Sequence, residues 1–319
     1  MDCVLIYNPV AGRNRAGRVE LMREIADALR ALGHRIELKP TTGPGSAAAQ
    51  AEDAVRAGAQ VVFACGGDGT IHEVIQGLTS EAGAPTAALG IIPLGSANAL
   101  ARHMRLPLDP LQAALQQIRS TPSLVPAGKV AFNGGQRYFT VMAGAGPDGA
   151  LAYSLLASKK SSLGRLAYYL HAARLFITRR FRRFDVTYTE AASGSILSCR
   201  AVSVMTVRVG SLGGLFSRLA GRGGLIDDAH LQLLILRPPA LLSLPLWFFS
   251  GWLNLHRLNP FLHSVQATDF SCTPCSHPAP HFQADGECLG RIPIRVSVVP
   301  DALRILLPSQ DAFEQQTSI

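Results

Sequence analysis

The chain has 319 residues, of which 48% are apolar and 16% are charged. This composition indicates a folded globular protein and excludes a disordered chain or a coiled coil, and the length allows two domains with separate cores. The formal net charge of +8 favours anionic partners, such as phosphates, acidic lipid surfaces or nucleic acid, without choosing among them.

Residues 1–124 alternate between short apolar runs and amphipathic segments. Apolar residues recur at the spacing of one helix face between Val19 and Leu29, and Gly33 is typical of a helix end. Extended apolar runs, such as residues 59–67, separate this helix from further ones. Strands that alternate with helices in this way predict an α/β domain with a parallel sheet.

Four loops follow the predicted strands, at residues 8–12, 41–45, 66–70 and 93–98. Because the carboxyl ends of parallel strands meet at one edge of a sheet, we expect these loops to share one rim. The third loop, Gly-Gly-Asp-Gly-Thr, could cradle a phosphate, since residues without a Cβ let backbone N–H groups approach an anion. A plain glycine turn explains the same residues equally well, and the Asp carboxylate fits a phosphate site only if it holds Mg²⁺ or meets a hydrogen-bond donor.

From about residue 125 the sequence changes to shorter extended runs separated by Gly, Asn, Ser and Pro, with a helical insert near residues 149–182. This pattern predicts a second, mostly antiparallel β domain. The most apolar segment, residues 238–256, is interrupted by Pro245 and Gly251 and is too short to span a membrane, but it could lie at an interface.

Six cysteines are scattered along the chain, and the N-terminus lacks the pattern of a signal peptide, so a reducing cytoplasm is the expected location. Cys272 and Cys275, with His277 nearby, suggest a zinc site, but a structural zinc ion needs four ligands. A turn with two coincidental thiols is the favoured interpretation.

Four motifs occur in the order YNPVAG (7–12), CGGDGTIHEVIQGL (65–78), PLGSANALAR (93–102) and ADGE (284–287). Together they make the chain similar to the diacylglycerol kinase catalytic family, which includes bacterial lipid kinases, sphingosine kinases and ceramide kinases. The GGDGT motif alone also resembles NAD kinases and phosphofructokinases, whereas the first and last motifs point to the lipid branch.

The resemblance implies an ATP-binding α/β domain at residues 1–124 with 303–319, and a lipid-binding β-sandwich at residues 125–302. It implies Mg²⁺-dependent transfer of the ATP γ-phosphate to a lipid hydroxyl. The ATP site would contain Asn8, Thr41, Gly66, Gly67, Asp68, Gly69, Thr70, Ile71, His72, Ser96 and Asn98.

The resemblance makes Glu287 the base that accepts the hydroxyl proton, a role that suits a carboxylate within hydrogen-bond reach. In the sphingosine kinase branch the equivalent of Asp68 is the usual base, so both assignments stay open. The resemblance also implies a structural Mg²⁺ at Asp228, with backbone atoms of Leu225 and His230, although Ala229 replaces a usual glycine. Asp148 would contact the lipid headgroup.

The arginine-rich segment from Arg174 to Arg183 could rest on an anionic membrane. We expect a cytoplasmic protein that associates peripherally with the inner face of the membrane and has no nucleic-acid partner. An exposed edge strand could pair two copies into a homodimer. The acceptor stays open among diacylglycerol, monoacylglycerol, sphingosine and ceramide. Two alternatives are an NAD kinase-like enzyme with a soluble acceptor and a non-catalytic nucleotide- or lipid-binding relative.

Overall fold

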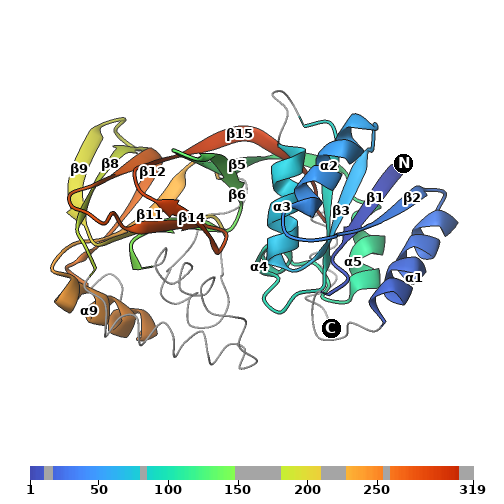
Figure 1. The fold of residues 1–319 in the computed structure, drawn as a ribbon, viewed down its shortest axis with the longest axis horizontal. Coiled ribbons are helices and arrows are strands. Elements are labelled where there is room, and N and C mark those ends of the chain that lie inside the picture. The colour runs from blue at the N-terminus through green and yellow to red at the C-terminus, as the bar shows by residue number, and fades with distance from the viewer. Residues whose placement is uncertain (11–16, 80–84, 148–180, 210–227, 254–258, 309–319) are drawn as a thin grey trace. The chain divides into compact units, whose positions relative to one another are not determined.

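The computed structural model describes residues 1–10, 17–79, 85–147, 181–209, 228–253 and 259–308 (Figure 1). The chain divides into two compact units. The N-terminal unit consists of Met1–Ala127 and Pro300–Ile319, and the C-terminal unit consists of Gly128–Val299.

The N-terminal unit contains a parallel sheet in the order β2-β1-β3-β4, whose strands are β1 (Asp2–Tyr7), β2 (Arg35–Pro40), β3 (Val61–Gly66) and β4 (Ala88–Pro93). The last residues of β15 (Ile294–Leu306) extend this sheet, because Arg304 and Ile305 pair in parallel with β4. All residues of β3 and β4 are buried, as expected of strands covered on both faces.

Helices cover this sheet, and they are α1 (Arg18–Ala31), α2 (Ser46–Arg56), α3 (Asp68–Leu78), α4 (Ala99–His103) and α5 (Pro110–Gln117). Met22, Ile25 and Leu29 of α1 share one apolar cluster with Ala114 of α5. Helices α2 and α3 pack against each other so closely that a Cβ at Gly77 would collide with the backbone oxygen of Ala48.

Antiparallel strand pairing predominates in the C-terminal unit among the residues that the structure describes. The unit contains one helix, α9 (Ala240–Trp252), within that described part. Two strands, β5 (Pro122–Phe132) and β15, contribute residues to both units. The other strands of the C-terminal unit are β6 (Gly135–Phe139), β7 (Met142–Ala145), β8 (Phe184–Glu190), β9 (Ile196–Ala201), β10 (Ser203–Val207), β11 (Leu231–Leu236), β12 (Leu262–Pro274), β13 (His281–Ala284) and β14 (Glu287–Arg291).

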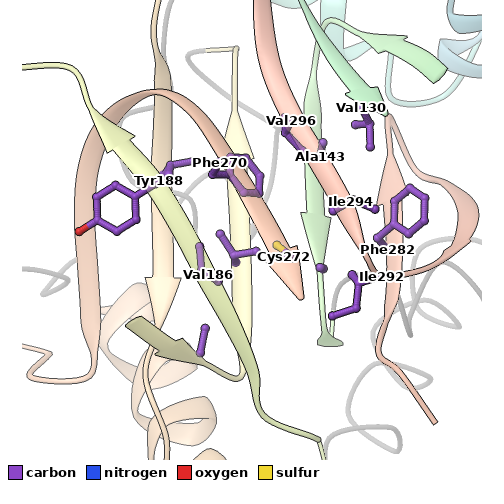
Figure 2. Packing of buried hydrophobic residues seen from close by; sticks show 14 of the residues in the cluster. Val130, Ala143, Val186, Tyr188, Phe270, Cys272, Phe282, Ile292, Ile294 and Val296 are labelled. Atoms are coloured by element: carbon purple, nitrogen blue, oxygen red, sulfur yellow. The ribbon is translucent and has the colours of Figure 1, made fainter. Parts of the chain in front are cut away.

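The core of this unit is a large apolar cluster in which Val186, Phe270 and Cys272 come from β8 and β12 (Figure 2). Phe282 of β13 lies in the same cluster with Ile294 of β15. Strands that alternate buried and exposed residues, such as β8, supply one face to this core, which is the usual pattern of antiparallel sheets.

The predicted combination of an α/β unit with an antiparallel β unit is confirmed. The predicted helical insert near residues 149–182 lies outside the described residues, apart from its last two positions. Within the described part of the chain, no helix is both long enough and apolar enough to cross a membrane.

Candidate functional site

The four predicted loops begin at one level of the N-terminal sheet. Tyr7 is in register with both Pro40 and Cys65, and Gly66 is in register with Pro93. Backbone hydrogen bonds continue this register beyond the strands, from the N–H of Asn8 to the oxygen of Cys65 (3.1 Å) and from the N–H of Thr41 to the oxygen of Tyr7 (2.8 Å). The structure therefore brings Asn8, Thr41 and the glycine loop, residues 66–70, to one rim of the sheet.

The glycine loop and the β4–α4 loop touch through bare backbone. A Cβ at Gly95 would lie 2.6 Å from the Cα of Gly67 and 2.7 Å from the Oδ1 of Asn98, which is closer than real Cβ atoms approach. Gly66 is equally restricted, because a Cβ there would collide with the side chain of Thr70. Gly67 and Gly95 thus allow the two loops to pack together, and Gly66 makes room for Thr70 within its own loop.

Gly69 differs from these glycines. A Cβ at Gly69 would meet no atom within 4 Å, and the residue is exposed in the first turn of α3. The first N–H groups of a helix have no partners within the helix and favour anions. Gly69 therefore leaves room for an anion at the N-terminus of α3, which is the space that a phosphate group would occupy.

The other predicted ATP-site residues differ in exposure. Ser96 is exposed, whereas Thr70, Ile71 and His72, near the start of α3, are buried. The side-chain oxygen of Asn8 accepts a hydrogen bond from the N–H of Val10 (3.0 Å), which fixes the shape of the first loop. The arrangement presents mainly backbone and small polar groups at the rim.

Asp68 joins the glycine loop to the start of α4. Its carboxylate oxygens accept hydrogen bonds from the backbone N–H of Asn98 (3.0 Å) and of Ala99 (2.6 Å). Asn98 has a positive φ of 50°, and its side chain bonds both the N–H and the carbonyl of Gly95. The side chain of Asn98 therefore stabilises the conformation of its own loop, a role that the sequence did not reveal.

Glu287 is the exposed first residue of β14, directly after a two-residue hairpin turn. Ala284 and Glu287 pair across the turn, and its central residues, Asp285 and Gly286, have φ values of 47° and 83°. Two positive φ values are typical of a type I′ turn, for which Asp-Gly is a preferred sequence. The tight turn fixes the direction in which the backbone presents Glu287.

The carboxylate of Asp285 holds this hairpin against the segment between β6 and β7. It accepts hydrogen bonds from three consecutive backbone N–H groups, those of Thr140 (3.0 Å), Val141 (2.9 Å) and Met142 (2.9 Å). The N–H of Asp285 also donates to the oxygen of Met142 at 2.8 Å. Asp285 belongs to the ADGE motif, but the sequence predicts no role for its carboxylate. The Asp-Gly pair indicates a tight turn and carries no information about the N–H groups that the carboxylate contacts.

Asp228, the predicted ligand of a structural Mg²⁺, lies beside a buried cation. The Nη2 of Arg208 donates to the backbone oxygen of Asp228 at 2.9 Å, and Arg208 is only 1% exposed. His230 is exposed, and the described residues contain no group of three His, Cys, Asp or Glu side chains that could hold a metal. The structural Mg²⁺ at Asp228, for which backbone oxygens were also expected as ligands, stays a prediction, and a buried guanidinium lies beside it.

Three predicted functional features lie wholly or largely outside the described residues. They are Asp148, Leu225 and the greater part of the segment from Arg174 to Arg183, of which residues 181–183 are described. The two cysteines of the possible zinc motif are separated by environment. Cys272 is buried in the core, where burial raises the pKa of its thiol, whereas Cys275 is exposed.

The observed architecture defines a class of protein. A parallel α/β unit with loops at one rim and a glycine-lined helix N-terminus is typical of proteins that bind phosphorylated ligands. Residues 2–130 match the family model described as the diacylglycerol kinase catalytic domain.

Two relatives match over most of their length. A diacylglycerol kinase of Bacillus subtilis is 31% identical over 236 residues, covering 73% of each chain. A protein of Pectobacterium atrosepticum named probable lipid kinase YegS-like is 31% identical over 301 residues, covering 92% of this chain and 93% of the relative. A solved structure of a diacylglycerol kinase from Bacillus anthracis matches the fold with a TM-score of 0.66 at 18% identity, covering 96% of each chain.

This chain therefore belongs to the diacylglycerol kinase family of lipid kinases. Membership confirms the resemblance that the four motifs carried. It also favours a lipid acceptor over the soluble acceptor of an NAD kinase-like enzyme.

Proposed function

We propose that this protein transfers the γ-phosphoryl group of ATP, in the presence of Mg²⁺, to a hydroxyl group of a membrane lipid. The observation that carries the ATP site is the open space at Gly69 in the first turn of α3, on the rim shared by Asn8 and Thr41. A helix N-terminus and bare backbone are what a triphosphate needs for close approach. Diacylglycerol is the first acceptor to test, because the Bacillus subtilis relative is named a diacylglycerol kinase. Sphingosine and ceramide are the next acceptors to test.

Asp68 is assigned to organising Mg²⁺ and ATP. Its carboxylate accepts hydrogen bonds from the N–H groups of Asn98 and Ala99, which orient it at the rim. A carboxylate is a suitable ligand for Mg²⁺, a hard cation that prefers oxygen. When bound, Mg²⁺ offsets the negative charge that develops as the phosphoryl group moves.

Glu287 is assigned as the base. Its side chain is exposed. The hairpin that carries it is held by the hydrogen bonds of the Asp285 carboxylate to consecutive backbone N–H groups, called the Asp285 clamp below. A carboxylate presented in this way can take the proton of an acceptor hydroxyl as that oxygen attacks the phosphorus. Asp148 as a headgroup contact, a structural ion at Asp228 and a homodimer stay predictions.

The ATP site is tested with Gly69→Ala, because the added methyl group meets no neighbour in the protein. We expect unchanged thermal stability with weaker binding of ATP, measured by calorimetry. Glu24→Ala, at an exposed position of α1, is the matched helix control and should leave ATP affinity unchanged. Unaltered ATP affinity in Gly69→Ala would remove α3 from the site.

The reaction is tested with purified protein, Mg²⁺, labelled ATP and single lipids in detergent micelles. Glu287→Gln should lower kcat by about 10²- to 10⁴-fold while leaving ATP affinity intact, as expected for loss of a general base. Asp68→Asn should instead weaken the binding of ATP in the presence of Mg²⁺. Normal rates in both variants, or no phosphorylated product from any lipid with the unaltered protein, would refute the proposal.

A further inference from the structure

Helix α9 has an unusual composition for a helix at the surface of a protein. Its sequence, ALLSLPLWFFSGW, contains no charged residue. Part of this apolar character is explained by packing, because Leu244 is buried with Val202 and Leu236 in a small cluster that Trp247 also contacts. This packing holds α9 against the strands of the C-terminal unit (Figure 1).

The opposite side of α9 exposes leucines instead of the charged residues that a surface helix normally carries there. Leu241 is 86% exposed, Leu242 58%, Leu246 36% and Leu253, just after the helix, 50%. Leu242 and Leu246 are four residues apart, which places them on one side of α9. These four residues form the leucine face, and an apolar surface of this kind marks an interaction site.

Three exposed arginines lie near α9 among the residues that the structure describes. Phe181 packs against the same small cluster as Leu244, and the next two residues, Arg182 and Arg183, are exposed. Arg237 is also exposed, three residues before α9 begins. Exposed leucines with arginines nearby match the surface of an anionic bilayer, which offers acyl chains below a layer of phosphates.

We propose that the leucine face of α9 inserts into the surface of an anionic lipid bilayer, with Arg182, Arg183 and Arg237 at the level of the lipid phosphates. A helix of 13 residues is about 20 Å long, short of the ~30 Å hydrocarbon core, so it lies in the plane of the bilayer. The choice of a bilayer over a second copy of the chain rests on the proposed function, since the acceptor of a lipid kinase resides in a bilayer.

The test is sedimentation of the full chain with two kinds of vesicle, phosphatidylcholine alone and a mixture of phosphatidylcholine with phosphatidylglycerol. The main variant changes Leu241, Leu242 and Leu246 to Gln, which keeps good helix propensity and alters only exposed side chains. The control variant changes Leu32 and Leu108 to Gln, two exposed leucines of the N-terminal unit.

The unaltered protein and the control should sediment with the mixed vesicles, and the α9 variant should partition roughly tenfold less for each leucine removed. Changing Arg182 and Arg183 to Gln should weaken binding to the mixed vesicles by about fivefold for each arginine and reduce its salt dependence. Equal partitioning of the α9 variant and the unaltered protein would overturn the proposal. A dimer that becomes a monomer in the α9 variant would overturn it too, by identifying a second copy as the occupant.

The vesicle assay contains neither ATP nor an acceptor, so its result is independent of the proposed reaction. Phosphorylation of a lipid presented in detergent micelles should be unchanged in the α9 variant, because the leucine face is not part of the catalytic machinery. Vesicle binding without any kinase activity would leave the membrane site standing and remove the proposed function. Kinase activity without vesicle binding would do the reverse.

Discussion

Replacing Asp285 with glycine removes a carboxylate that accepts three backbone hydrogen bonds, from Thr140, Val141 and Met142. Glycine tolerates the positive φ of 47° at this position, so the change isolates the loss of the clamp from backbone strain. A hydrogen bond to a charged group contributes about 1.5–3 kcal/mol, and the three bonds share one acceptor and are partly open to water. We therefore expect a loss of about 3–5 kcal/mol, a large part of the ~5–15 kcal/mol that stabilises a typical domain.

The assay is urea unfolding of the full chain, followed by tryptophan fluorescence, combined with kinetics on micellar lipid. Asp285→Asn keeps one acceptor oxygen and tolerates the same φ, so it should lie between the unaltered protein and Asp285→Gly in both stability and kcat. Asp301 also has a positive φ, of 49°, but its exposed carboxylate accepts no hydrogen bond from the described residues, so Asp301→Gly is the matched control. Equal unfolding midpoints for Asp285→Gly and Asp301→Gly would refute the claim that the hydrogen bonds to the Asp285 carboxylate stabilise the protein.

Three further predictions follow from single contacts. Gly95→Ala should destabilise the protein by about 1–3 kcal/mol and weaken ATP binding, because its methyl group would force the β4–α4 loop away from Gly67. Thermal unfolding measures the loss of stability, and calorimetry measures the loss of ATP affinity. Gln117→Leu should cost about 1–3 kcal/mol in urea unfolding, because the buried amide of Gln117 bonds the N–H and carbonyl of Ile91. Alkylation at pH 8, read by mass spectrometry, should modify exposed Cys275 long before Cys65 and Cys272, since burial raises the pKa of both core thiols and keeps them protonated at that pH.

The metal site implied near Asp228 would lie next to a buried arginine. Arg208 carries a permanent charge and donates to the backbone oxygen of Asp228, and burying so large a cation requires acceptors around it. Metal analysis of the dialysed protein tests whether this site exists. One bound Mg²⁺ per chain without ATP would support the site that the family resemblance implies.

The sequence could predict the α/β unit, the antiparallel β unit and the four loops, because strand and helix periodicities and glycine-rich strand ends are local properties of the chain. It could not predict that Gly95 packs on Gly67, since the two residues belong to separate loops that only the register of β3 and β4 brings together. For the same reason it could not distinguish Gly69, which faces open space, from Gly66, which Thr70 crowds.

The sequence by itself determined the family and singled out the candidate acids of the GGDGT and ADGE motifs, because both depend on residue types in a fixed order. Only the tertiary structure decided what those acids contact. Asp68 meets the start of α4 from 30 residues away, and Asp285 meets the β6–β7 segment from more than 140 residues away. A carboxylate can bond any N–H group that folding brings within about 3 Å, and sequence spacing carries no record of that distance.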